Sequence, residues 1–167
     1  MSNLTLNQVV RESITEALFR LMHNKDFEKI KIKEITDLAG VGRVSFYRNF
    51  DSKKEVVIQQ LNAVTKQWCL LHQDELQRLK DYLPLLEELK PILVLLKSSN
   101  GTDLLYDYLY EALLPQMDTE KRAYLLEMQV GMFFGIMKHW IRNDFKESQE
   151  QLNHFLACLD QCNFPEK

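Results

Sequence analysis

The densest group of chemically capable side chains lies in a short basic stretch near the N-terminus. Its members are hydrogen-bond donors: Arg43, Ser45, Tyr47, Arg48, Asn49, Lys53 and Lys54. Guanidinium and ammonium groups bind phosphate, and an arginine can also donate two hydrogen bonds to O6 and N7 of a guanine. No Ser/His/Asp or Cys/His arrangement in the sequence indicates nucleophilic catalysis. The group therefore indicates polyanion binding, and we expect no enzyme.

Two short predicted helices would hold this group. The first carries Ile35 and Leu38 on one face and ends at Gly40, which suits a left-handed C-cap. The second covers residues 43–49, after the turn formed by residues 40–42. An amphipathic helix over residues 7–23 precedes both. Two short helices joined by a three-residue turn with glycine have the spacing of a helix-turn-helix, whose second helix enters the major groove.

The run from Ile35 to Val56 resembles the DNA-binding region of the TetR/AcrR family of regulators. The resemblance covers residues 7–57, and its strongest element is the aromatic-Tyr-x-x-Phe-x-x-Lys pattern made by Phe46, Tyr47, Phe50 and Lys53. The family implies a three-helix DNA-binding head, a helical C-terminal body, homodimerisation through the last two long helices and, often, a ligand cavity in the body. We expect no cofactor.

The resemblance assigns roles residue by residue. It implies phosphate contacts for Tyr47 and Lys53, with Asn49 as a third contact to the DNA backbone. The residues that it turns toward the bases are Arg43, Val44, Ser45 and Arg48, with Lys33 on the preceding helix. Two positions depart from the family pattern, since Gly42 and Lys31 stand where a hydroxyl side chain usually caps the following helix. Val44 and Arg48 also allow a plain structural or solvated interpretation.

Helix formers dominate the remaining chain, which has only 5 glycines and 4 prolines. Ser52 and Glu55 fit a capping box that begins a fourth helix running to about Lys80. Pro84 and Pro91 suit first-turn positions or kinks in one or two short helices that end near residue 98. Further helices are expected over residues 103–114, 118–143 and 147–162. The prediction is an all-α chain of about nine helices, with a head over residues 1–51 and a body over residues 52–167.

Residues 131–141 resemble the C-terminal region of a Gram-positive TetR subgroup. Apolar and small residues in the helices expected over residues 118–143 and 147–162 predict a dimer interface of Gly131, Phe134, Gly135, Ile141, Leu152, Phe155, Leu156 and Leu159. The alternative is that these faces close the core of the monomer itself. Aromatic residues with polar tips predict an effector pocket of Trp68, His72, Tyr82, Leu86, Tyr106, Tyr110 and Phe133. These side chains suit an ordinary core equally well.

Charge is unevenly distributed along the chain. The whole sequence has a net charge of −3, yet residues 25–54 hold eight basic and five acidic residues, and the chain from residue 58 onward carries −5. A basic head on an acidic body suits phosphate binding at one end.

Three cysteines without framework spacing, and no secretory or membrane-spanning run, predict a cytoplasmic protein. His154, Cys158 and Cys162 lie along one stripe, but they are too far apart to share one ion, so we expect no metal.

Together these features predict a homodimeric repressor that binds a near-palindromic operator in double-stranded DNA and is released by a small effector. The alternative is a TetR-like co-activator whose body binds a partner protein. No membrane is expected among its partners.

Overall fold

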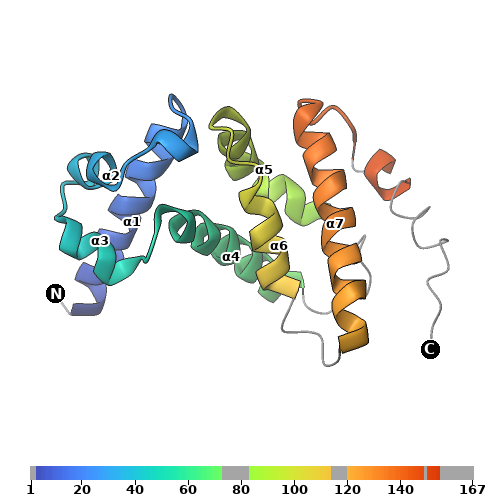
Figure 1. Cartoon of the computed structure of the whole chain (residues 1–167), viewed down its shortest axis with the longest axis horizontal. Coiled ribbons are helices and arrows are strands. Elements are labelled where there is room, and N and C mark those ends of the chain that lie inside the picture. Colours follow the sequence, from blue (N-terminus) through green and yellow to red (C-terminus); the bar gives the residue numbers. More distant parts are fainter. Residues whose placement is uncertain (1–2, 73–82, 114–119, 149, 155–167) are drawn as a thin grey trace.

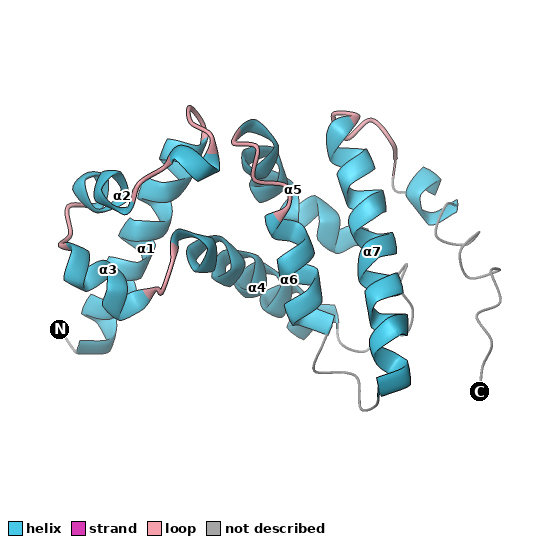
Figure 2. Cartoon of the chain, viewed as in Figure 1, coloured by secondary structure: helices cyan, strands magenta, loops and turns pink. Residues whose placement is uncertain are grey.

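The computed structural model describes residues 3–72, 83–113, 120–148 and 150–154. In these ranges every regular element is a helix (Figure 2), which confirms the all-α prediction. The seven α-helices and the one 3-10 helix are α1 (Asn3–Met22), η1 (Phe27–Lys29), α2 (Ile32–Ala39), α3 (Arg43–Asn49), α4 (Lys53–His72), α5 (Leu83–Ser98), α6 (Leu104–Leu113) and α7 (Glu120–Arg142). Residues 150–154 are also helical. None of the described helices is long and apolar enough to cross a membrane.

The head consists of α1, α2 and α3, at the left of Figure 1. One face of α1 is apolar and buries Ile14 and Leu18 in the same core as Ile35 of α2 and Phe46 of α3. The turn between α2 and α3 depends on Gly40, whose φ of +67° lies in the left-handed region that glycine adopts without strain. The amide of Val41 donates to the Thr36 carbonyl across this turn. The predicted C-cap is therefore present, and α2 and α3 form a helix-turn-helix.

The body is built on α4, which runs from the head into the remaining helices (Figure 1). It packs against α5 and α6, and α6 packs in turn against α7. The segment around Pro84 and Pro91 forms one helix, α5, with Pro91 inside it. The indole of Trp140 near the end of α7 is buried and donates to the Glu147 carbonyl at 3.1 Å.

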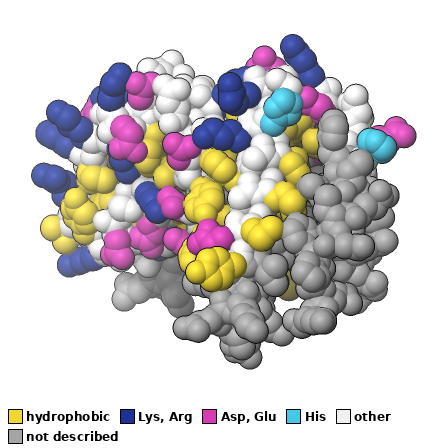
Figure 3. Space-filling model, turned by 45° about the vertical axis from the view of Figure 1, so that its right-hand side comes forward, with side chains coloured by type: hydrophobic (Ala, Val, Ile, Leu, Met, Phe, Trp, Pro, Cys, Tyr) yellow, Lys and Arg dark blue, Asp and Glu magenta, His cyan; other side chains and the backbone are white. Residues whose placement is uncertain are grey.

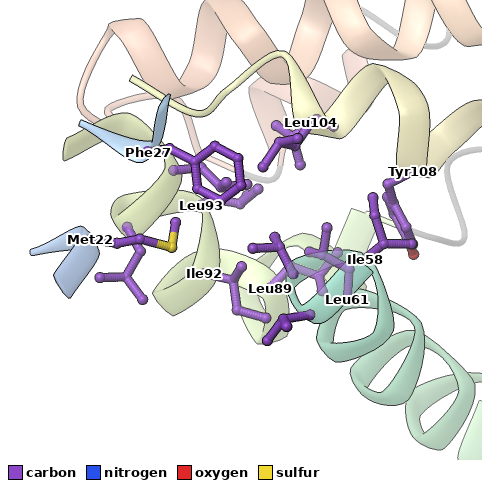
Figure 4. Close-up of a cluster of buried hydrophobic side chains, with 14 of the residues drawn as sticks. Met22, Phe27, Ile58, Leu61, Leu89, Ile92, Leu93, Leu104 and Tyr108 are labelled. Carbon is purple, nitrogen blue, oxygen red and sulfur yellow. The ribbon is translucent and has the colours of Figure 1, made fainter. Parts of the chain in front are cut away.

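The head and the body share one core. Met22 and Phe27 from the head lie in the same buried cluster as Leu93 of α5 and Leu104 of α6 (Figure 4). The Phe27 amide donates to the Ser99 carbonyl at 2.7 Å just beyond α5. Residues 23–31, the α1–α2 link, are therefore held against the body by side-chain packing and by a backbone hydrogen bond.

Candidate nucleic-acid interface

The outer face of α3 carries the predicted base-reading residues. Arg43, Val44 and Arg48 are exposed, Val44 to 66% of its surface, whereas Phe46 is completely buried. Ser45 is half-buried. The helix begins after Gly42, whose carbonyl accepts from the Phe46 amide, and ends at Asn49, before the extended backbone of Phe50. The exposed side chain of Val44, next to Arg43, suits contact with a thymine methyl group.

A groove of about 600 Å³ lies beside this face, between the first turns of α2 and α4. Its lining consists of Ile30, Lys31, Ile32, Lys33, Arg43, Tyr47, Asp51, Ser52 and Lys53. Four cationic side chains thus line it against one carboxylate. Helix N-termini carry partial positive charge from unpaired amides, so the two helix starts add to this field. Figure 3 shows Lys and Arg side chains gathered at the head end of the molecule. The groove is suited to phosphate.

Tyr47 lies in this groove with 52% of its surface exposed, and its ring packs edge-on against Phe46 at a centroid distance of 5.4 Å. The ammonium of Lys33 pairs with Asp37 at 2.5 Å, and both side chains are largely exposed. An exposed pair of this kind contributes little to stability, so Lys33 can exchange its partner for a phosphate or a base at small cost. The structure therefore brings Lys33, Arg43 and Tyr47 to one surface.

The first turn of α4 is capped by Ser52, whose Oγ accepts from the Glu55 amide at 3.1 Å. This confirms the hydroxyl half of the predicted capping box. The Glu55 carboxylate accepts from the Asp51 amide, one residue earlier than in a standard box. The start of α4, at the edge of the groove, is thus held by hydrogen bonds of both the Ser52 and the Glu55 side chains.

The first turn of α2 is capped by Glu34, a residue that the sequence analysis did not identify. Lys31 stands at the N-cap, and its own amide donates to the Glu34 carboxylate at 3.0 Å. The Lys25 ammonium binds the other carboxylate oxygen at 2.7 Å. The Lys25 contact and then the Lys31 amide lower the pKa of Glu34. A glutamate three positions after the N-cap was the available signal, because it is half of a capping box.

Replacing Glu34 with glutamine is expected to weaken the head in a pH-dependent way. Because the folded-state pKa of Glu34 is lowered, its contribution to stability is full above the ordinary value of 4.5 and disappears as pH falls through the folded pKa. The unfolding free energy of Glu34→Gln should lie below that of the wild type at pH 7, and the difference should shrink toward pH 3. Urea unfolding at the two pH values measures this. A difference independent of pH would show that the Glu34 charge contributes nothing.

The C-terminal end of α3 is held by Arg11 of α1, a second residue missed from the sequence. Its guanidinium donates to the Asn49 carbonyl at 3.0 Å and lies 4.6 Å from the centroid of the Phe50 ring. Asn49 itself donates from Nδ2 to the Ser45 carbonyl at 2.8 Å. Among the described residues no donor reaches its buried Oδ1. Asn49 is half-buried. Its side chain therefore stabilises the end of α3, whereas a contact with the DNA backbone stays a prediction.

The predicted effector-pocket residues occupy several environments. Trp68 and Leu86 are buried in the core, and His72 stacks on Trp68 with 4.3 Å between ring centroids. Tyr106 donates to Glu127 of α7 at 2.6 Å, and this carboxylate raises the pKa of the phenol. Tyr110 and Phe133 are half-buried. Tyr82 lies outside the described residues.

The predicted interface residues also separate into groups. Gly131 and Gly135 are exposed on α7, and Phe134 is half-buried with its ring edge against Tyr106. Ile141 and Leu152 are buried in the chain's own core. Three predicted interface residues lie outside the described residues: Phe155, Leu156 and Leu159. The same holds for Cys158 and Cys162, which share a predicted helical stripe with His154. His154 is exposed.

A helix-turn-helix with an exposed basic recognition helix, carried on a helical body, defines a DNA-binding transcription regulator. Residues 14–59 match the family described as bacterial regulatory proteins, tetR family, and residues 74–159 match the family described as transcriptional regulator C-terminal region. The chain belongs to the TetR family of bacterial regulators.

Solved structures share the fold over nearly the whole chain. Lin0861 from Listeria innocua gives a TM-score of 0.74 at 15% identity, covering 96% of this chain and 93% of its own. A TetR transcriptional regulator from Streptococcus agalactiae 2603V gives 0.59 at 19% identity, covering 92% and 95%. At these identities the likeness concerns the fold alone. No curated protein matches the sequence.

Proposed function

We propose that this TetR-family regulator is a repressor that binds a near-palindromic operator as a homodimer and leaves it when a small effector binds the body. The observation that carries the DNA-binding part is the exposed face of α3 beside a groove with four cationic side chains and one carboxylate. In this proposal Arg43, Val44, Ser45 and Arg48 face the bases, and Tyr47 contacts a phosphate. Lys33 lies beside them on α2.

Selection of binding sites from a library of random duplexes tests this function and identifies the operator sequence at the same time. The expected result is an enriched sequence with two inverted half-sites, separated by one helical turn or a multiple of it, because each protomer presents one recognition helix. Affinity for the enriched duplex should fall steeply with salt. Failure to enrich any sequence, with the protein folded, would contradict the proposal.

The dimer is proposed to form on one stripe of α7. Tyr124 is 80% exposed and Met128 is 51% exposed, and both lie on the same helical stripe as Gly131 and Gly135. A cluster of exposed large apolar side chains next to small residues is typical of a helix-helix contact. Because Ile141 and Leu152 are already buried within one chain, we place the proposed contact on this accessible stripe of α7.

Replacing Gly131 with arginine is therefore expected to convert the dimer to a monomer. A Cβ at this position meets nothing within 4 Å in the single chain, so the monomer fold should persist. Gly131→Ala is the matched control, since it adds only a methyl group and raises helix propensity by about 1 kcal/mol. Sedimentation velocity measures the assembly state. An undiminished dimer in Gly131→Arg would exclude this stripe as the interface.

Effector release is the part of the proposal that concerns the body. α4 begins at the groove and carries Trp68 and His72 at its far end, so a ligand that shifts this helix can change the spacing of the two heads. A compound that raises the melting temperature and dissociates the bound duplex would support the proposal. Compounds that stabilise the chain without reducing duplex affinity would argue against coupling through α4.

A further inference from the structure

Lys53, the first residue of α4, makes a set of contacts that its position in the family pattern does not predict. Its ammonium donates to the carbonyls of Phe27 at 2.6 Å, Glu28 at 3.0 Å and Ile30 at 3.1 Å. It also lies 4.6 Å from the centroid of the Phe27 ring. An ammonium has three N–H donors, so these three carbonyls use its full donor capacity.

The three carbonyls belong to η1 and the residue after it. The last carbonyls of a helix lack partners within the helix, and a cation placed there both satisfies them and interacts favourably with the helix dipole. The Phe27 carbonyl also accepts from the Ile30 amide at 3.1 Å, so Lys53 is its second partner. Ile30 is buried, so its carbonyl has limited access to water as an alternative partner. Lys53 thus adds, from 23 to 26 residues away, a side-chain cap to the backbone cap that the Ile30 amide already gives η1.

This link connects the parts that form the phosphate groove. Ile30 and Lys31 lead directly into α2, and both line the groove together with Lys53. On its other side the link is tied to the body by the Phe27 amide, which donates to the Ser99 carbonyl, and by Asn100, which donates to Asp26 at 2.9 Å. A contact between Lys53 and the link therefore sets the start of α2 relative to the start of α4.

The geometry points to Lys53 as a positioning residue for DNA binding, which clamps the α1–α2 link onto α4, rather than as a phosphate ligand. This inference rests on the proposed function. Binding a phosphate through its donors would take Lys53 away from three carbonyls and release the link that places Lys31, Lys33 and Tyr47 around the groove. Lys31 and Lys33, which are exposed and line the groove, supply the positive charge that meets the phosphates.

The salt dependence of duplex affinity separates the two roles. A side chain that neutralises one phosphate contributes about one to the slope of log K against log salt, whereas a positioning residue changes affinity at every salt concentration alike. The experiment uses the full chain and the selected duplex, with Lys53→Met, Lys53→Arg and the exposed-site control Lys33→Ala. Arginine keeps the charge but offers a planar fork that cannot direct three donors at these carbonyls.

The expected result is that Lys53→Met and Lys53→Arg both weaken binding roughly tenfold, with the wild-type salt slope in each. In Lys33→Ala the magnitude of the salt slope should be smaller by about one, because Lys33 is expected to neutralise a phosphate. Wild-type affinity in Lys53→Arg, or a slope lower by about one in Lys53→Met, would overturn the inference.

Amide hydrogen exchange without DNA tests the clamp separately from the proposed function. The Phe27 and Ile30 amides, which donate to the carbonyls of Ser99 and Phe27, should exchange faster in Lys53→Met than in the wild type. Unchanged exchange at both amides would overturn the clamp even if the chain bound no duplex. Failure of the wild type to bind any duplex, with faster exchange in the variant, would instead refute the proposed function and leave the clamp supported as a structural contact.

Discussion

Replacement of Phe46 with alanine is expected to destabilise the head by about 3–5 kcal/mol, the usual cost of removing a large aromatic side chain from a core. Phe46 is completely buried, and its ring packs against Phe50 at a centroid distance of 6.0 Å as well as against Tyr47. A loss of this size is a large fraction of the stability of an ordinary domain. Urea unfolding followed by circular dichroism should show the loss, and duplex binding should fall with it.

Val44→Ala is the matched control for stability, because it lies two positions earlier on the same helix and is mostly exposed. It should change the unfolding free energy by less than about 0.5 kcal/mol. Similar losses in the two variants would mean that α3 does not pack in the orientation described.

Replacement of Arg43 with alanine is expected to weaken specific binding by about 1–3 kcal/mol, a factor of roughly 5 to 150 in affinity. Arg43 begins α3, is exposed and lines the groove, so the variant should unfold like the wild type. Because the expected contact is a bidentate pair with one guanine, the loss should be confined to duplexes that carry this base. Fluorescence anisotropy with the selected duplex and its single-base variants measures both effects.

Lys66→Ala provides the charge-matched control, since Lys66 is exposed on α4 and lies outside the lining of the groove. Its affinity should equal that of the wild type. An equal loss for every duplex in Arg43→Ala would indicate a phosphate contact and would remove Arg43 from base reading.

Local signals in the sequence were sufficient to predict α3 and its turn. Gly40 adopts the predicted left-handed backbone, and α3 covers the predicted residues 43–49. These features depend on neighbours within a few positions, where side-chain type and backbone preference agree. The short η1 was not among the predicted elements, because three residues are too few for a helical period to show.

Long-range contacts could not be predicted from these patterns. Arg11 reaches the Asn49 carbonyl across 38 residues, and Lys53 reaches the carbonyl of Phe27 across 26. Backbone carbonyls have no residue-specific signal, so nothing in the sequence indicates which cation will cap them. In the body, apolar periodicity placed Ile141 on an apolar face and predicted a dimer interface there, but it could not show that the chain's own core covers this residue.

Sequence-specific DNA binding is best tested by the affinity of the wild-type chain for a duplex from its own upstream region, measured beside a scrambled duplex at about 50 mM and about 200 mM salt. We expect tight binding that falls steeply with salt and exceeds binding to the scrambled duplex by at least about 10³-fold. Equal affinity for the two duplexes, or affinity for neither, would contradict a role as an operator-binding regulator.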